Sequence, residues 1–155
     1  MMMQDTHKIP ITILICDDDE DDRMLTQQAL EDAHIANNLR FVEDGEDLLD
    51  YLHQRAAYAG ETGAAPRPGL ILLDLNMPNM DGREALKIIK ADPTLRDIPV
   101  VVLTTSGLGE DVIQSYQLGV NSFITKPVTF SGLVEAMNVL GRYWLEIVEL
   151  PPVAA

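Results

Sequence analysis

Residues 70–82 read LILLDLNMPNMDG, and this stretch decides the fold class. Residues 70–73 are apolar throughout, Asp74 follows them directly, and Asp81-Gly82 is a turn signal. Strands of a parallel sheet that are covered on both faces are continuous apolar runs, whereas a strand with one wet face alternates apolar and polar residues. The stretch therefore predicts a buried strand in the middle of a parallel sheet, ending at a carboxylate.

Short β-branched runs alternate with longer segments of helical period on either side of this stretch. The predicted strands are Ile11–Cys16, Leu39–Val42, Leu70–Leu73, Val100–Leu103 and Ser122–Thr125. The predicted helices span about 22–33, 46–54, 83–91, 110–118 and 130–148. Strict alternation predicts an α/β chain of the (βα)5 type, a doubly wound parallel sheet with helices on both faces. Residues 55–69 lack either period and are predicted to form a long surface loop.

Composition limits the size of the protein and its partners. The chain has 155 residues, 46% of them hydrophobic, which suits one domain with a core of its own. Its 25 acidic residues against 11 basic ones give a net charge of -14, so nucleic acid and membrane surfaces are poor candidate partners. Cys16 is the only cysteine and is predicted to be buried. Without a disulfide framework, a signal peptide or a long apolar run, we expect a cytoplasmic protein.

Chemically active side chains follow four of the five predicted strands. Asp17 and Asp18 come after the first strand, Asp74 after the third, Thr104 after the fourth and Lys126 after the fifth. In an open parallel sheet, ligands bind at the carboxyl ends of the strands, near the point where the winding reverses. We therefore expect three carboxylates, a hydroxyl and an ammonium group to meet at one edge of the sheet.

Carboxylates gathered in this way favour a bound cation. Like charges destabilise the fold unless a cation compensates them, and ligation by oxygen alone suits Mg2+. The neighbouring residues Asp19, Glu20, Asp21 and Asp22 are interpreted instead as the solvated acidic start of a helix. With Mg2+ and Lys126 to neutralise the phosphoryl oxygens, Asp74 could attack phosphorus and form an acyl phosphate.

Four motifs in this order resemble the receiver domain of two-component response regulators, over about residues 11–140. They are the pair Asp17-Asp18, residues 71–78 with Asp81-Gly82, residues 100–105 and residues 123–127. The resemblance implies a flavodoxin-like fold with strand order 2-1-3-4-5. It is closest to the stand-alone regulators of phytochrome-type histidine kinases. We accordingly expect a flexible N-terminus at 1–8, a receiver domain at 9–150 and a short tail at 151–155.

The resemblance also implies a role for each residue of the site. Asp74 would accept a phosphoryl group from a phospho-histidine kinase in a phosphorelay. Asp18, Asp74 and the backbone carbonyl of Asn76 would bind Mg2+, with Asp17 acting mainly through a metal-bound water. In crystals, Mn2+ or Ca2+ can substitute for Mg2+. Lys126 would hold the phosphoryl group. Such a protein catalyses only its own phosphorylation and dephosphorylation and is not a turnover enzyme.

Two further residues would convert phosphorylation into a change of surface. Thr104 would move toward the phosphoryl oxygens, and Phe123 would turn inward into the space it leaves. The alternative reading of Phe123 is an ordinary core residue of the fifth strand. The resemblance further implies a cis bond between Lys126 and Pro127, which is inexpensive before proline.

After the receiver only residues 141–155 remain, so output is expected to pass through contact with another protein. The predicted core stripe of the last helix consists of Phe130, Leu133, Met137, Leu140 and Trp144. Four further apolar residues are left over for another surface: Tyr143, Ile147, Val148 and Leu150. An exposed apolar strip usually marks an interface, so we predict a homodimer that uses this region. The alternative is a tail that folds back over its own core.

Two other classes of function use a similar pattern. A phosphatase of the haloacid dehalogenase type also has a strand-end aspartate and Mg2+, but it needs a second acid where this chain has Asn76. A pseudo-receiver would keep the fold and leave the site unused, although every expected site residue is present. A calcium loop over residues 17–28 is excluded, because Asp22 stands where its glycine belongs.

Overall fold

The computed structural model describes residues 11–33, 38–59, 65–75, 77, 80–104, 117, 119–120, 122–127 and 129–142. Its strands form one parallel sheet in the order β2-β1-β3-β4-β5, as predicted. The strands are β1 (Thr12–Cys16), β2 (Asn38–Val42), β3 (Leu70–Leu73), β4 (Val100–Thr104) and β5 (Ser122–Thr125). The chain moves from β1 to β2 on one side and then returns past β1 to β3. The winding therefore reverses between β1 and β3.

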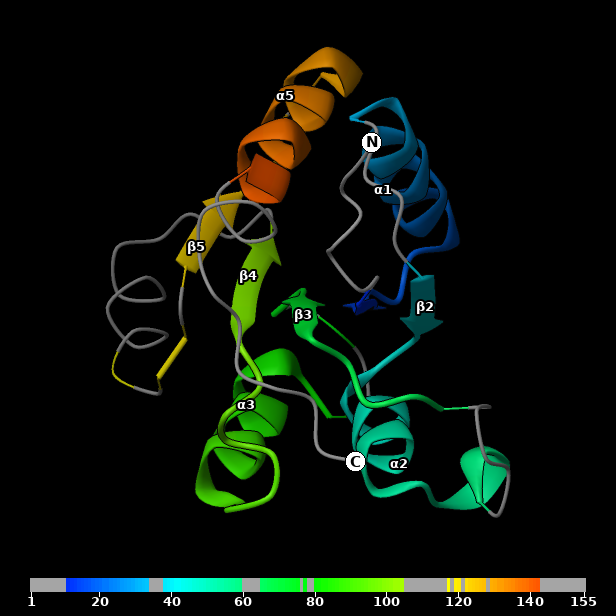
Figure 1. Ribbon diagram of the computed structural model, residues 1–155, viewed down its shortest axis with the longest axis vertical. Helices are drawn as coiled ribbons and strands as arrows, with labels where there is room; N and C mark the ends of the chain where they lie inside the picture. Colours follow the sequence, from blue (N-terminus) through cyan, green and yellow to red (C-terminus); the bar gives the residue numbers. More distant parts are fainter. Residues whose placement is uncertain are drawn as a thin grey trace, which may run out of the picture.

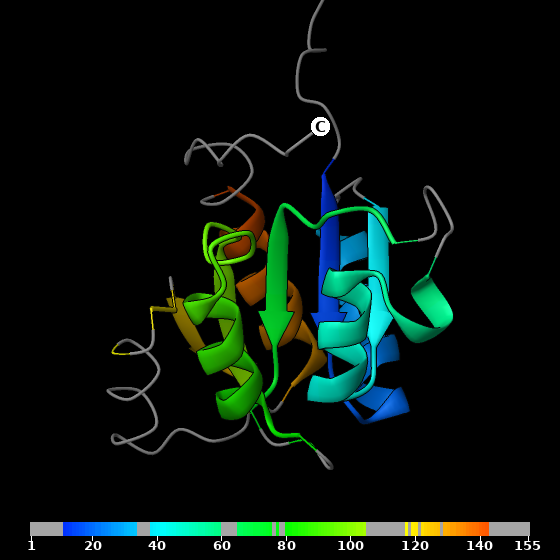
Figure 2. The same cartoon turned by 90° about the horizontal axis from the view of Figure 1, so that it is seen from below.

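Helices cover both faces of the sheet. They are α1 (Glu20–Asp32), α2 (Gly45–His53), α3 (Gly82–Ala91), α5 (Phe130–Gly141) and a short 3-10 turn, η2 (Ala56–Tyr58). α1 and α5 lie on one face, and α2 and α3 on the other (Figure 1). Seen from below, the arrowheads of β1, β2 and β3 point toward one edge (Figure 2). The predicted helix at 110–118 and the tail from residue 143 lie outside the described residues, apart from residue 117.

Two apolar layers hold the sheet between its helices. Along β1, Leu14 and Cys16 belong to one buried cluster with residues of α2 and α3, while Ile13 and Ile15 belong to a second with residues of α1 and α5. Every residue of β3 and β4 is buried, which confirms their predicted central position. No helix of the described part of the chain is long and apolar enough to cross a membrane.

Two predicted segments differ in detail from the structure. α1 begins at Glu20 rather than at about residue 22, because the side chain of Asp19 caps it by accepting the backbone N–H groups of Asp21 and Asp22. The predicted loop at 55–69 contains η2, and Tyr51 anchors its far end by donating to the carbonyl of Pro66 at 2.8 Å. A three-residue turn is too short to produce a periodic pattern in the sequence.

The predicted core stripe of α5 is correct in its middle and wrong at its start. Leu133, Met137 and Leu140 are buried, whereas the side chain of Phe130 is 40% exposed. Phe130 is the first residue of α5, directly after the capping residue Thr129, and lies beside an open cavity rather than in the core. Trp144 lies outside the described residues.

Candidate functional site

Backbone pairing extends past the ends of the strands and aligns the predicted site residues. The N–H of Asp74 donates to the carbonyl of Cys16 at 3.0 Å, and that of Lys126 donates to the carbonyl of Thr104 at 2.8 Å. The residues that follow β1, β3 and β5 are thus held level with one another at the carboxyl edge. Because the register decides which side chains meet, the predicted convergence follows from strand pairing.

Three carboxylates form a compact acidic group at this edge. Asp17, Asp18 and Asp74 each offer one oxygen, and these atoms lie within 4.8 Å of one another. Asp17 and Asp74 are buried and Asp18 is exposed, so the group opens to solvent on one side. Carboxylate oxygens at this spacing, with room for water, fit the hard, octahedral coordination of Mg2+.

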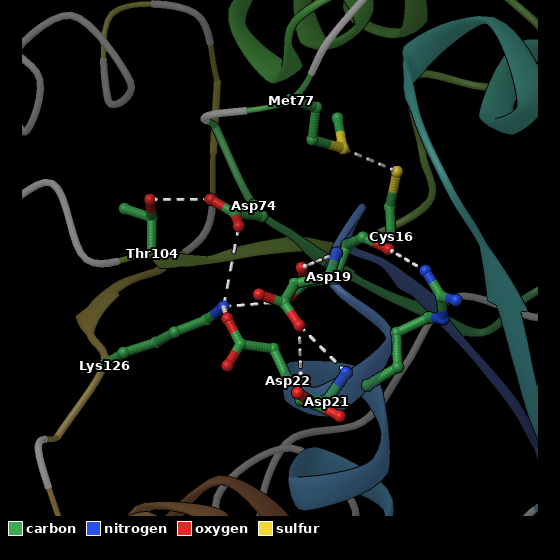
Figure 3. Close-up of polar contacts among 10 residues, drawn as sticks. Cys16, Asp19, Asp21, Asp22, Asp74, Met77, Thr104 and Lys126 are labelled. Atoms are coloured by element: carbon green, nitrogen blue, oxygen red, sulfur yellow. Dashed lines mark hydrogen bonds and ion pairs between the residues drawn. The ribbon is translucent and has the colours of Figure 1, made fainter.

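Lys126 lies at the centre of a larger group of charges. Its ammonium nitrogen is 2.6 Å from Oδ2 of Asp17, 3.2 Å from Oδ2 of Asp22 and 3.5 Å from Oδ2 of Asp74 (Figure 3). Burial lowers the pKa of Lys126, but the hydrogen bond to Asp17 and the nearby negative charges outweigh burial and raise it. Lys126 is therefore an ammonium ion in the folded protein.

The site holds more negative charge than Lys126 alone can balance. Burial raises the pKa of the Asp17 carboxyl, and the hydrogen bond from Lys126 offsets part of that rise. The carboxyl groups of Asp18, Asp22 and Asp74 lie in the same group of charges. A divalent cation would balance the excess, so the donor set fits Mg2+ in charge as well as in chemistry.

Thr104 contacts the other oxygen of the Asp74 carboxylate. It is fully buried, and its hydroxyl donates to Oδ1 of Asp74 at 2.8 Å (Figure 3). Asp74 thus has Oδ1 on a hydroxyl donor and Oδ2 toward the ammonium group of Lys126. Both contacts restrict the rotation of a side chain that would otherwise be free to turn at the end of its strand.

The connection between β3 and α3 is fixed by two glycines. The N–H of Gly82 donates to the carbonyl of Leu75, and that of Gly45 donates to the carbonyl of Met80, both at 3.0 Å. A Cβ atom on Gly82 would lie 2.4 Å from the carbonyl oxygen of Asp74, and one on Gly45 would lie 2.5 Å from that of Met80. The N-termini of α2 and α3 can approach this connection closely because both positions lack a side chain.

A sulfur contact joins the same connection to β1. The thiol of Cys16 lies 3.3 Å from the thioether of Met77 and 3.5 Å from the carbonyl oxygen of Asp44. Burial, and next the charge of Asp44, raise the pKa of the Cys16 thiol. Cys16 is therefore a packed thiol in the folded protein, which agrees with the prediction from its apolar surroundings.

The structure brings Asp17, Asp18, Thr104 and Lys126 together around Asp74, as predicted. Asn76 lies outside the described residues. Phe123 is half-buried and packs against the core cluster shared with α2 and α3. No peptide bond within the described ranges is cis, so the predicted cis bond before Pro127 is wrong. The two isomers before proline differ by only about 0.5–1 kcal/mol, so the local sequence does not decide between them.

Asp22 lies in the acidic start of a helix, as predicted, but its carboxylate also contacts the site, which the prediction did not include. It is the third residue of α1, and its carboxylate contacts Lys126 rather than only water. Helical side chains lean toward the N-terminus of their helix, and the N-terminus of α1 lies at the carboxyl edge of the sheet. That direction is the signal that could have placed Asp22 at the site. Asp19, by contrast, is a capping residue, as an acidic helix start requires.

The fold and this edge of the sheet define a response regulator receiver domain, and the chain belongs to that family. The family model for the response regulator receiver domain matches residues 13–138. Receiver domains bind Mg2+ at an acidic pocket, and Mg2+ is accordingly the metal cofactor of this chain.

Individual relatives resemble the chain over nearly its whole length. Response regulator Rcp1 of Synechocystis sp. is 42% identical over 149 residues, covering 96% of this chain and 99% of the relative. A solved structure of Mn(2+)-bound Rcp1 is 43% identical, with a TM-score of 0.83 over 92% of this chain and 100% of that one. The structure of the phosphorylated cyanobacterial phytochrome response regulator RcpA is 41% identical, with a TM-score of 0.84 over 93% of this chain and 100% of that one.

Proposed function

We propose that Asp74 is the phosphoacceptor of this response regulator and that a phospho-histidine of a kinase is its donor. The observation that carries the proposal is the position of Asp74 between a hydroxyl donor and an ammonium group, beside two further carboxylates. Lone aspartates at the ends of strands do not require such partners. A carboxylate that must attack phosphorus does, because negative charge on the phosphoryl oxygens has to be neutralised.

The residues around Asp74 have separate tasks in the transfer. An oxygen of Asp74 attacks phosphorus, the bond from phosphorus to the donor nitrogen breaks, and its electron pair leaves with the imidazole ring. Lys126 shifts its hydrogen bonds from the carboxylates to the phosphoryl oxygens, and Thr104 donates to another of these oxygens. Asp17, Asp18 and Asp74, with the backbone carbonyl of Asn76, would hold Mg2+, which would supply positive charge for the same oxygens.

The protein is a signal transducer rather than a turnover enzyme. The same site would catalyse both the formation and the hydrolysis of its own aspartyl phosphate. A phosphate group on Asp74 would draw Thr104 toward it and let Phe123 move inward. Phe123 is half-buried against the core cluster, where a shift of its ring would alter the surface near β5.

A histidine kinase is the partner that a receiver response regulator implies. We infer a kinase of the phytochrome type, because solved relatives that resemble this chain over most of its length are phytochrome or bacteriophytochrome response regulators. The kinase would meet the regulator in the cytoplasm.

We further propose that the receiver domain spans residues 9–150 and forms a homodimer through the region of α5. Sedimentation at micromolar concentration tests the dimer, and monomer alone with and without a phosphoryl mimic contradicts it.

Incubation with acetyl phosphate and Mg2+, followed by intact mass measurement, tests the acceptor. The expected result is one added phosphoryl group on the unmodified chain. It should be absent from Asp74→Asn and from samples with EDTA. Asp81→Asn serves as a matched control, since Asp81 caps α3 and lies outside the acidic group. Modification of Asp74→Asn to the same extent would contradict the assignment, and no modification under any donor would indicate a pseudo-receiver.

A further inference from the structure

We propose that Asp22 is a specificity residue of this site, one that favours phosphoryl donors that carry a cationic ring over donors with an anionic leaving group. The inference rests on the proposed function and adds to it a reason for preferring phospho-histidine. The starting observation is that the Asp22 carboxylate contacts Lys126 but does not belong to the metal group.

The position of Asp22 separates it from the other acids. Its Oδ2 lies 3.2 Å from the nitrogen of Lys126, but it is absent from the compact group formed by Asp17, Asp18 and Asp74. Its side chain is 39% exposed, whereas that of Lys126 is 11% exposed. Asp22 thus contacts the lysine from the solvent side, where a donor arrives. Because Asp22 lies outside the metal group, Mg2+ bound there would not coordinate its carboxylate.

An open cavity of about 90 Å³ lies on this side of Lys126. Four apolar and four polar residues line it: Leu25, Pro127, Phe130 and Leu133, and Asp22, Thr26, Lys126 and Thr129. Leu25 and Phe130 are among the exposed large apolar residues of the protein. The cavity can accommodate a ring the size of imidazole, and Asp22 is the acidic group in its lining.

The two classes of donor differ in the charge they bring past Asp22. A phospho-imidazole with a protonated ring loses phosphorus from its nitrogen, keeps the electron pair and departs as neutral imidazole. Acetyl phosphate breaks its phosphorus–oxygen bond and departs as acetate. Both reactions leave the same aspartyl phosphate on Asp74. Asp22 attracts the imidazolium of the first donor and repels the developing carboxylate of the second, so it alters the ratio of the two rates.

The test compares rates of phosphorylation by phospho-imidazole and by acetyl phosphate, with saturating Mg2+ and at about pH 5.5, where an imidazole ring is largely protonated. In Asp22→Asn, the ratio of the phospho-imidazole rate to the acetyl phosphate rate should fall roughly fivefold, as expected for one charge acting at short range in a half-exposed site. Asp21→Asn is the matched control, because it removes the same charge from the same turn without a contact to Lys126. Its ratio should stay within a factor of about two.

A general loss of Lys126 positioning slows both donors alike and leaves the ratio unchanged, so the ratio separates specificity from structure. Asp22→Ala provides a second variant, and urea unfolding confirms that each variant is folded. An equal ratio in Asp22→Asn, Asp22→Ala and the unmodified protein overturns the inference. Equal falls in Asp22→Asn and Asp21→Asn overturn it as well, because they indicate net charge alone. If the unmodified protein accepts phosphate from neither donor, the proposed function fails first and the inference fails with it.

Discussion

At the scale of single residues, the ammonium group of Lys126 contacts more carboxylates than a single ion pair would. Three carboxylates surround it, and the nearest, Asp17, is buried with it. Removing one partner of a buried ion pair leaves the other charge uncompensated in a poorly hydrated position, which is far more costly than replacing both partners. Lys126 is therefore a structural residue as well as a chemical one.

Lys126→Met should lower the free energy of unfolding by about 2–4 kcal/mol in EDTA, because Asp17 then remains buried without its cation. Mg2+ should restore a larger share of stability to this variant than to the unmodified protein, since the ion replaces the missing positive charge. Urea denaturation with EDTA and with Mg2+ measures both quantities. The half-buried Lys90, which donates to the carbonyls of Arg96 and Ile98, offers a control in Lys90→Met, which Mg2+ should stabilise no more than it stabilises the unmodified protein.

Thr104→Val keeps the shape of the residue and removes the hydroxyl that donates to Asp74. Loss of this buried hydrogen bond should lower stability by about 1–2 kcal/mol and slow phosphorylation by acetyl phosphate. Thr104→Ser keeps the hydroxyl and should retain most of the phosphorylation rate. Denaturation and timed mass spectrometry measure the two effects. Equal rates for the valine and serine variants would contradict a role for the hydroxyl.

At the scale of elements, the N-terminal turns of α2 and α3 fix the connection that follows Asp74. Gly45 and Gly82 are the positions at which backbone approaches backbone too closely for a side chain. This arrangement ties the site to the helices on one face of the sheet. α2 thereby contacts the connection directly, although the helix is remote in sequence from Asp74.

Gly45→Ala should lower the free energy of unfolding by about 1–3 kcal/mol, since its Cβ would overlap the backbone of Met80 and force the two elements apart. The shift should also weaken Mg2+ binding, because the displaced connection follows Asp74 directly. Glu46→Ala, at the next and exposed position of α2, should change neither quantity appreciably. Denaturation and calorimetric titration with Mg2+ provide the comparison. If Gly45→Ala is destabilised but binds Mg2+ with unchanged affinity, the packing at Gly45 does not influence the metal site, and the prediction is wrong.

Tyr51 of α2 makes the stability of the fold depend on pH in the alkaline range. Burial raises the pKa of Tyr51 to about 12, and the charge of Arg40 opposes part of that rise. Because the pKa is higher in the folded state than the ordinary value of about 10, folding favours the neutral phenol. The resulting stabilisation is complete below about pH 10 and is lost as the pH rises toward about 12.

Tyr51→Phe should remove this contribution to the fall of the unfolding free energy with rising pH. The variant also loses the hydrogen bond to Pro66 and should be less stable by about 1 kcal/mol near neutral pH. Unfolding free energies at about pH 8 and about pH 11 test the slope, and absorbance of tyrosinate follows the titration directly. The pKa of Tyr58 is also raised, by burial and by its hydrogen bond to Asp47, so Tyr58→Phe should reduce the slope further. An unchanged slope in both variants would contradict this origin.

At the scale of the whole molecule, negative charge dominates the electrostatics. The net charge is -14, and part of it is concentrated at one edge of the sheet. A ligand that binds only the folded state stabilises it, by about 2.7 kcal/mol at a concentration one hundred times its dissociation constant. Folding and metal binding are therefore coupled in this protein.

Asp18→Asn should leave stability unchanged or slightly higher in EDTA, because it relieves repulsion at an exposed position, yet it should strongly reduce the stabilisation by Mg2+. Thermal unfolding over a series of Mg2+ concentrations measures this contrast. Asp21→Asn is the control for charge alone and should keep the full response to Mg2+. A full response in Asp18→Asn as well would exclude Asp18 as a ligand.

The sequence by itself determined the sheet, its helices and the group of residues at its carboxyl edge. Continuous apolar runs identified β3 and β4 as central strands. The polar residues after four of the five strands identified the site, because parallel strands end at the same edge. These features depend on periodicity and chain direction, which are local. Resemblance to a known family supplied the strand order and the roles.

The tertiary structure alone decided which neighbours the remaining side chains have. Asp22 contacts Lys126, which lies more than one hundred residues further along the chain, only because the first turn of α1 lies against the end of β5. Phe130 borders a cavity instead of the core because α5 begins beyond the packed part of the sheet. The peptide bond before Pro127 is trans, and the local sequence does not decide between its two isomers. Such contacts depend on how distant elements pack, and no local pattern in the sequence encodes that distance.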